Sequence, residues 1–206
     1  MQLRQSTLLT SEQYVTEKAW LQASLKQCPS HPGGGCRFSR HGSYPRMEPP
    51  GMRVARYYCR EAHKTFSLLP DCLSCRLTGS LDEAEQVVIE VEESRSLEEA
   101  ASAVRPDLSL PGAIRWVRRR RQGVRAALLA LITLLPGQLG NTAELRSVRR
   151  TLGTERALVA LRGIAAAHLH ALPRPLGFRP ARPKSCQTEH RLQHKTGADP
   201  PRPLRY

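Results

Sequence analysis

The chain has 206 residues, of which 40% are hydrophobic, and a formal net charge of +14. This charge favours a polyanionic partner, most simply nucleic acid, whereas an aromatic content of 5% argues against a surface that stacks single-stranded bases. The strongest apolar run, residues 126–135, is too short to span a bilayer, so no membrane segment is expected.

The N-terminal region, residues 1–26, contains no apolar core of signal-peptide length. We therefore expect a cytoplasmic protein whose six cysteines stay reduced, which favours metal binding over disulfides. Residues 1–12 are expected to be a frayed lead-in. Loosely periodic apolar residues and Trp20 then predict a helix over 11–26.

Residues 27–79 are expected to form a small unit organised by a metal. Two ligand clusters, one at Cys28, His31 and Cys36 and one at Cys59 and His63, flank a predicted β-hairpin. Its arms cover residues 37–46 and 52–58, and Glu48-Pro49-Pro50-Gly51 supplies the turn. Because so small a unit rarely buries enough apolar surface by itself, we predict a zinc ribbon with one structural Zn²⁺.

The preferred ligand set is Cys28, Cys36, Cys59 and His63, with His31 as the alternative to Cys36. Glycines 33–35 would allow the first loop to fold back towards the metal. Reduced buried cysteines with surface histidines are the alternative interpretation. The later pair Cys72 and Cys75 has no second ligand pair nearby and is interpreted as small buried residues, although exchange into the main site stays open.

Residues 80–172 carry the signals of successive helices. Ser80 precedes acids in a predicted first turn and an apolar stripe over 81–93, and Ser96 with Glu99 predicts a capping box for a helix over 96–105. Pro111 suits the first turn of a helix over 112–121. This succession is typical of a helix-turn-helix in which 96–105 supports a reading helix at 112–121.

The basic residues are concentrated in the second half, because residues 108–206 contain nineteen lysines and arginines against four acids. The predicted reading helix would present a run of arginines to DNA: Arg115, Arg118, Arg119, Arg120 and Arg121. A solvated helix face is the alternative explanation of such a run.

The remainder of the chain predicts a small helical bundle and a tail. An apolar stripe begins at Val124 and would be covered by amphipathic helices over 142–152 and 154–170, or would form the face of a homodimer. From residue 173 the composition becomes basic and Pro-rich, which predicts a disordered tail over 173–206 with its Cys186, His190 and His194 exposed. The expected fold class is α+β.

The motifs CPSHPGGGC, RHGSYPR, RVARYYC and HKTFSLLPDCL follow one another over residues 27–77. This pattern resembles the zinc ribbon at the front of bacterial insertion-sequence transposases and their short non-catalytic relatives, in which a ribbon and a helix-turn-helix hold the transposon end. The resemblance implies that double-stranded DNA is contacted by four residues of the ribbon: Arg37, Arg40, His41 and Arg46. The chain departs from the family where His63 stands in place of a second cysteine.

No enzymatic activity and no small-molecule substrate are expected. The chain lacks a Gly-rich phosphate loop, a Ser/His/Asp set and an H-E-x-x-H motif, and no alternating strands follow the predicted helix-turn-helix to carry metal-bound carboxylates. We therefore expect a non-catalytic, nucleoid-associated DNA-binding protein related to transposon sequences. The alternative is a zinc-stabilised protein-interaction module without a role in nucleic-acid binding.

Overall fold

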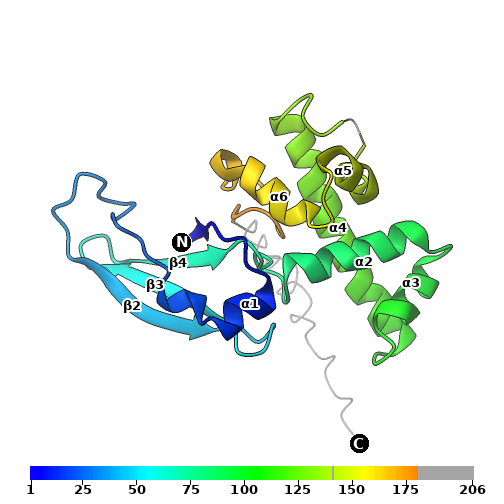
Figure 1. Cartoon of the computed structure of the whole chain (residues 1–206), viewed down its shortest axis with the longest axis horizontal. Coiled ribbons are helices and arrows are strands. Elements are labelled where there is room, and N and C mark those ends of the chain that lie inside the picture. Colours follow the sequence, from blue (N-terminus) through cyan, green and yellow to red (C-terminus); the bar gives the residue numbers. More distant parts are fainter. Residues whose placement is uncertain (141, 181–206) are drawn as a thin grey trace, which may run out of the picture.

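The computed structural model describes residues 1–140 and 142–180, which form a four-stranded sheet followed by a group of helices (Figure 1). Figure 1 places the sheet and α3 at opposite ends of the long axis. The elements are β1 (Gln2–Gln5), α1 (Ser11–Thr16), η1 (Ala19–Leu21), β2 (Phe38–Pro45), β3 (Arg53–Cys59), β4 (Lys64–Pro70), α2 (Leu81–Glu93), α3 (Leu97–Val104), α4 (Leu110–Leu134), α5 (Leu145–Leu152), α6 (Ala157–Ile164) and η2 (Ala166–His168).

The sheet has the strand order β1-β4-β3-β2. Its β2–β3 hairpin is antiparallel and confirms the predicted arms, while β4 adds a further antiparallel strand that the sequence analysis did not anticipate. The α+β class is confirmed. β1 pairs in parallel with β4, from Gln2 opposite Ser67 to Gln5 opposite Pro70, so the expected frayed lead-in is a sheet edge instead.

The hairpin turn depends on local chemistry at residues 46–52. The backbone N–H of Arg46 donates to the carbonyl of Met52 at 2.8 Å and closes the loop. Gly51 has a φ of +76°, and a Cβ there would lie 3.1 Å from Cγ1 of Val15. Glycine therefore satisfies both the backbone conformation and the close approach of α1.

Both faces of the central strand β3 are covered. Tyr57 and Cys59 pack in a small cluster with Phe66 and Leu68 of β4. Val54 faces the main core instead, which continues through α2, α4, α5 and α6. The main core thus contains residues of both predicted units, 27–79 and 80–172.

The first two long helices begin at the predicted caps. The Ser80 hydroxyl accepts a hydrogen bond from the N–H of Glu83 at 2.9 Å, and the Ser96 hydroxyl accepts one from the N–H of Glu99 at 3.1 Å. The capping box differs from the expected one, because the Glu99 carboxylate accepts from the N–H of Arg95 rather than from that of Ser96. Apart from this contact, α2 and α3 confirm the local prediction.

Helix α4 corrects the prediction of a short reading helix followed by a separate apolar one. It is a single helix of 25 residues that passes through Gly123. A glycine inside a helix costs about 1 kcal/mol relative to alanine, yet the buried positions of α4 keep one helical period on both sides of it. Gly123 also lies against the chain at Arg174 and Pro175, where a Cβ would be 3.6 Å from the Arg174 carbonyl oxygen.

The segment after Leu172 is packed rather than disordered as far as it is described. Leu176 and Phe178 are buried in the main core, and the N–H of Phe178 donates to the carbonyl of Leu169 at 2.6 Å. Residues 181–206, the rest of the expected tail with Cys186, His190 and His194, lie outside the described residues.

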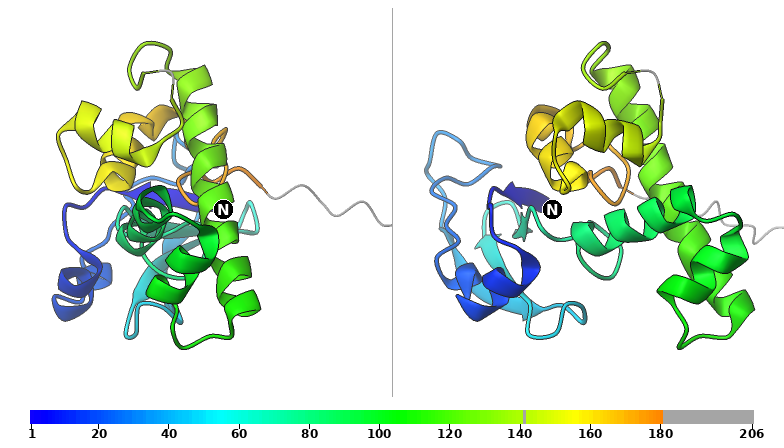
Figure 2. Two further views of the ribbon diagram at one scale, coloured as in Figure 1. Left: turned by 90° about the vertical axis from the view of Figure 1, so that its right-hand side faces the viewer. Right: turned by 45° about the vertical axis from the view of Figure 1, so that its right-hand side comes forward.

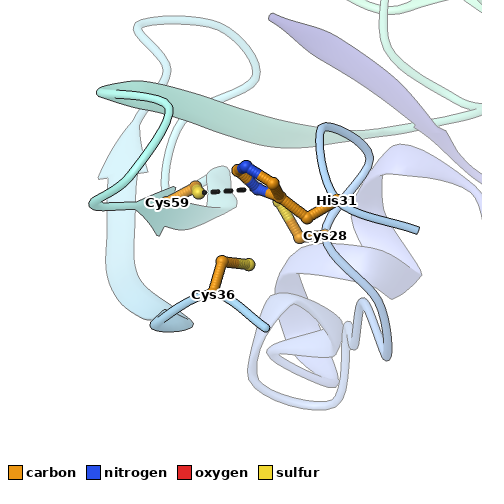
Figure 3. Close-up of side chains that lie close together, drawn as sticks. All are labelled: Cys28, His31, Cys36 and Cys59. Atoms are coloured by element: carbon orange, nitrogen blue, oxygen red, sulfur yellow. Dashed lines mark hydrogen bonds between the residues drawn. The ribbon is translucent and has the colours of Figure 1, made fainter. Parts of the chain in front are cut away.

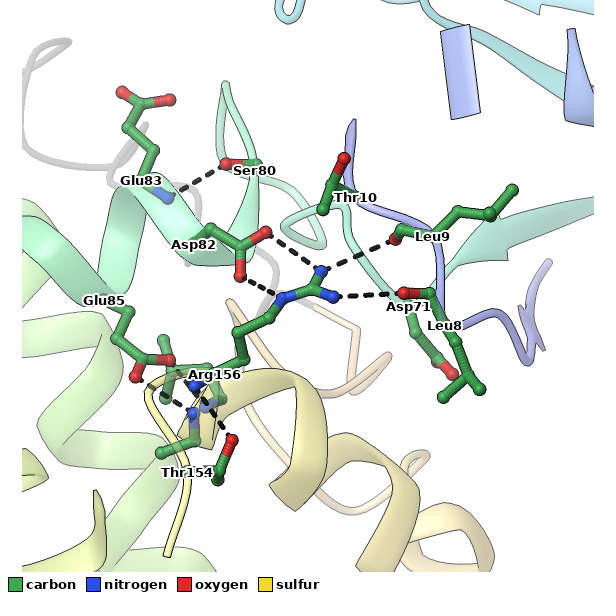
Figure 4. A network of polar contacts seen from close by, with 12 residues as sticks. Leu8, Leu9, Thr10, Asp71, Ser80, Asp82, Glu83, Glu85, Thr154 and Arg156 are labelled. Carbon is green, nitrogen blue, oxygen red and sulfur yellow. Dashed lines mark hydrogen bonds and ion pairs between the residues drawn. The ribbon is translucent and has the colours of Figure 1, made fainter. Parts of the chain in front are cut away.

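Two arginines tie the helices to the rest of the fold. Arg162 of α6 is fully buried and donates to five carbonyl oxygens, those of Pro70, Asp71, Leu73, Pro175 and Leu176. Arg156 pairs with Asp82 at 3.0 Å and also donates to the carbonyls of Leu8 and Leu9, as Figure 4 shows. These contacts join α6 both to the end of the sheet and to the N-terminal segment.

The C-terminal half of α4 lies beside α5 and its N-terminal half lies beside α3 (Figure 2). Helix α2 crosses α4 between α5 and α3. Within the described residues, no helix has both the length and the apolar character needed to cross a membrane.

Candidate metal centre

Three cysteines and a histidine converge at the open end of the β2–β3 hairpin (Figure 3). Cys59 is the last residue of β3 and lies opposite Phe38, the first residue of β2. Cys36 stands just before β2. Cys28 and His31 lie in the preceding loop, where the N–H of His31 donates to the carbonyl of Cys28 at 3.0 Å and makes a tight knuckle.

The loop between His31 and Cys36 returns through glycines in the left-handed region. Gly34 has a φ of +84° and Gly35 a φ of +77°, values that side chains other than glycine rarely adopt. This agrees with the role predicted for the three glycines, because the return brings Cys36 back to Cys28.

The spacing of the ligand atoms suits a tetrahedral metal. The four Sγ and Nδ1 or Nε2 atoms all lie within 4.8 Å of one another. Nδ1 of His31 is 3.4 Å from Sγ of Cys59 and 3.6 Å from Sγ of Cys28. In a tetrahedral zinc site with Zn–S bonds of about 2.3 Å and Zn–N bonds of about 2.0 Å, sulfur and nitrogen ligands lie about 3.5 Å apart. These residues could therefore hold a metal ion.

The fourth position of the group belongs to His31, and His63 lies outside it. His63 occupies the β3–β4 turn with a φ of +48°, and its Nδ1 is 3.4 Å from the hydroxyl of Tyr58. Three of the four preferred ligands are brought together, and the alternative His31 joins them without displacing Cys36. The sequence feature that indicates His31 as a ligand is its spacing from Cys28, because two intervening residues are typical of paired ligands in zinc sites.

The pKa values show how strongly the thiols interact without a metal. Burial opposes ionisation of Cys28, but hydrogen bonds from His31, the backbone and the other thiols outweigh it and lower its pKa to about 7. Burial and the Cys28 and Cys59 thiols raise the pKa of Cys36 to about 12. One thiolate forms readily and suppresses the next by like charge. A bound dication would remove that repulsion and favour all the thiolates.

Backbone and carboxylate groups surround the ligands. The N–H of Ala62 donates to Sγ of Cys59 at 3.4 Å. Glu61 accepts from the backbone N–H of Arg37 at 2.9 Å and from its Nε at 3.3 Å, which links the two loops that carry the ligands. Such outer contacts hold ligating side chains in place.

Cys72 and Cys75 lie apart from this group. Both are fully buried, as predicted for small core residues, and Sγ of Cys75 is 2.8 Å from Oε1 of Gln2. Burial raises the pKa of the Cys72 thiol to about 11, so it stays protonated at neutral pH.

The three arginines of the ribbon that were predicted to contact DNA form hydrogen bonds or an ion pair within the protein. The guanidinium of Arg40 donates to the carbonyls of Trp20, Leu21 and Ala23, and that of Arg46 to the carbonyls of Ser74 and Leu77. Arg37 pairs with Glu61. His41 is exposed, next to the irregularity in the β2–β3 register.

The arginines of α4 divide into two groups. Arg115, Arg118, Arg119 and Arg121 are exposed. Arg121 lies with Arg125 beside α5 and is therefore not part of the reading face. Arg120 is 3% exposed and lies over the ring of Trp116, with its guanidinium carbon 3.4 Å from the ring centroid. It also donates to the carbonyl of Thr78 and pairs with Glu83. Its burial corrects the expectation that it reaches DNA.

Comparison of the chain with protein-family models, with curated proteins and with solved structures found no match.

Proposed function

We propose that the protein is a non-catalytic DNA-binding protein in which one structural zinc ion holds the small sheet and helix α4 contacts duplex DNA. The observation that carries this proposal is the arrangement of α2, α3 and the first half of α4. These helices surround a small core of their own, formed by Val87, Ala101, Ala113 and Val117. In a helix-turn-helix protein, a comparable support presents the reading helix to the major groove.

The exposed side of α4 has the charge that this role needs. Arg115, Arg118 and Arg119 are three and four residues apart and therefore share one face of the helix. All three are exposed, and no acidic side chain of the described residues forms an ion pair with them. Guanidinium groups in this state can bind phosphate oxygens or the edge of guanine.

The donor set of the metal centre supports zinc. Three thiols and one imidazole are a known structural zinc set, and thiolate ligands select zinc over harder cations. Four protein ligands leave no open position for water, which favours a structural role. When bound, the ion would neutralise the thiolates and fasten the loop at residues 28–36 to the end of β3.

The sheet, whose β2–β3 end carries the metal centre, lies apart from helix α4 in Figure 1. We therefore propose that a short DNA segment contacts α4 alone and that the zinc ribbon stabilises the fold. This division differs from the expectation that the ribbon also holds DNA.

The test is the salt dependence of binding to a duplex. Each lost phosphate contact should reduce the slope of log K against log salt by about 0.9. R115A/R118A/R119A should bind more weakly with a flatter slope. The control R60A/K64A/R95A removes the same charge from exposed positions outside α4 and should keep the slope of the unaltered protein.

Equal slopes for the two triple variants would show that α4 has no special part in DNA binding. Binding that resists salt and prefers another protein would favour the interaction-module alternative. Supercoiled plasmid incubated with the protein and Mg²⁺ should be retarded on a gel but not nicked, because the proposal includes no catalytic role.

A further inference from the structure

Helices α2, α4 and α5 enclose a cleft that the proposed contact between α4 and DNA does not use. Its volume is about 570 Å³, within the range of about 300–1,000 Å³ common for small-ligand sites. Val88 of α2 and Val124 and Leu128 of α4 line the cleft and are almost completely buried. The apolar surface that a ligand can reach comes from Val91 of α2 and from Ala143, which are both half-buried, and these two side chains form an apolar floor.

Four arginines line this cleft from two sides. Arg121 and Arg125 come from α4, and Arg146 and Arg150 come from α5. Each pair is four residues apart, so its members lie one above the other on one helix face. All four side chains are exposed, and none forms an ion pair with an acidic side chain in the part of the chain that the structure describes.

Two glutamates also line the cleft, and within the described residues neither forms an ion pair with one of the four arginines. The Glu92 carboxylate accepts hydrogen bonds from the backbone N–H groups of Leu145 at 2.9 Å and Arg146 at 3.0 Å, so it caps the N-terminus of α5. Glu144 is exposed. The only hydrogen bond described for the Arg146 guanidinium goes to the Glu92 carbonyl at 3.3 Å. Four arginines against two glutamates leave an excess of two positive charges.

This combination selects for a particular ligand chemistry. A concave site with low-dielectric walls concentrates the field of its charges, and guanidinium groups bind phosphate oxygens in a bidentate fashion. The apolar floor would contact an uncharged ring or hydrocarbon body. We propose that the cleft binds a ligand with two or more phosphate charges and a body of nucleotide size.

The same phosphate chemistry has two sources, a free nucleotide and the backbone of a nucleic-acid strand. The proposal does not rest on the DNA-binding function of α4, because the residues of the cleft differ from Arg115, Arg118 and Arg119. The two sources are separated by testing them on the same variants.

The probes are ADP and inorganic pyrophosphate, titrated calorimetrically into the full zinc-loaded chain, with the zinc content measured afterwards. R125A/R150A removes one guanidinium from each side of the cleft. R115A/R118A removes two exposed arginines of α4 outside it. We expect R125A/R150A to weaken ADP binding by on the order of tenfold or more per arginine, and R115A/R118A to leave it unchanged. ADP should bind more tightly than pyrophosphate if the floor holds the base.

Duplex DNA forms the second arm. Loss of DNA affinity and a flatter salt slope in R125A/R150A, without measurable ADP binding to the unaltered protein, would assign the phosphates in the cleft to a nucleic-acid strand. The inference is overturned if neither ADP nor pyrophosphate binds and DNA binding by R125A/R150A equals that of the unaltered protein. Thermal melting of both variants checks that they fold.

Discussion

The carboxylate of Glu85 in α2 lies 2.7 Å from Nε of Arg149 in α5 and forms a buried ion pair. The same carboxylate accepts hydrogen bonds from the backbone N–H groups of Ala157 at 3.0 Å and Leu158 at 2.8 Å, at the start of α6. It therefore joins three helices and satisfies donors that α6 cannot satisfy itself. Figure 4 shows Glu85 beside the Arg156 network.

Replacing Glu85 by alanine should destabilise the fold strongly. The change leaves the largely buried Arg149 without this partner and removes the cap of α6. Breaking a buried ion pair costs about 3–5 kcal/mol. Urea unfolding of the zinc-loaded protein measures the loss. Glu155 is the control, because it pairs with the same Arg149 but is 86% exposed. E155A should lower the free energy of unfolding by less than about 1 kcal/mol, and equal losses would contradict this account.

Replacing His31 by alanine should weaken zinc binding far more than replacing His63. His31 belongs to the group of close ligand atoms, whereas the ring of His63 lies beside Tyr58. Losing a direct ligand should exceed the about 10–100-fold effect of losing an outer partner. Competition with a chromophoric chelator gives both affinities. A larger loss in H63A would return the fourth position to His63.

Zinc affinity should fall with acidification, and more steeply below neutral pH. The Cys36 thiol has a pKa of about 12 in the metal-free chain, so at any ordinary pH it must release its proton to solvent when it binds zinc. Cys28, with a pKa of about 7, adds a second proton only below that pH. Each released proton contributes about tenfold per pH unit. The slope of log affinity against pH should therefore increase by about one unit between pH 8 and pH 6, and a constant slope would contradict the assigned pKa of Cys28.

Replacing Arg120 by alanine should lower stability without changing the salt dependence of DNA binding. Its guanidinium is buried against Trp116 and bonded to Thr78, so the loss should be about 1–3 kcal/mol. R119A, at the neighbouring exposed position, should show the opposite pattern of a flatter salt slope and unchanged stability. Urea unfolding and a salt titration of both variants distinguish the two residues. A flatter slope in R120A would mean that this arginine reaches DNA.

Much of the local structure could be predicted because its causes lie within a few residues. The Pro-Pro-Gly sequence predicts the turn between β2 and β3, Ser80 and Ser96 predict the starts of α2 and α3, and the cysteines flanking the hairpin predict a metal centre at its open end. A cap or a turn depends on hydrogen bonds to residues three or four positions away. The residue types at those positions therefore predict it.

Other features depend on contacts between distant parts of the chain. Residues 2–5 form strand β1 because they pair with the edge of β4. Leu176 is buried because its side chain packs in the main core and its carbonyl accepts a hydrogen bond from Arg162. For the metal centre, the sequence alone determined the kinds of ligand and their two clusters. Only the tertiary structure decided that His31 faces the thiols and that Arg120 faces Trp116 rather than solvent. Spacing along the chain limits which side chains can meet, but the direction in which each one points is set by the packing of the elements that carry it.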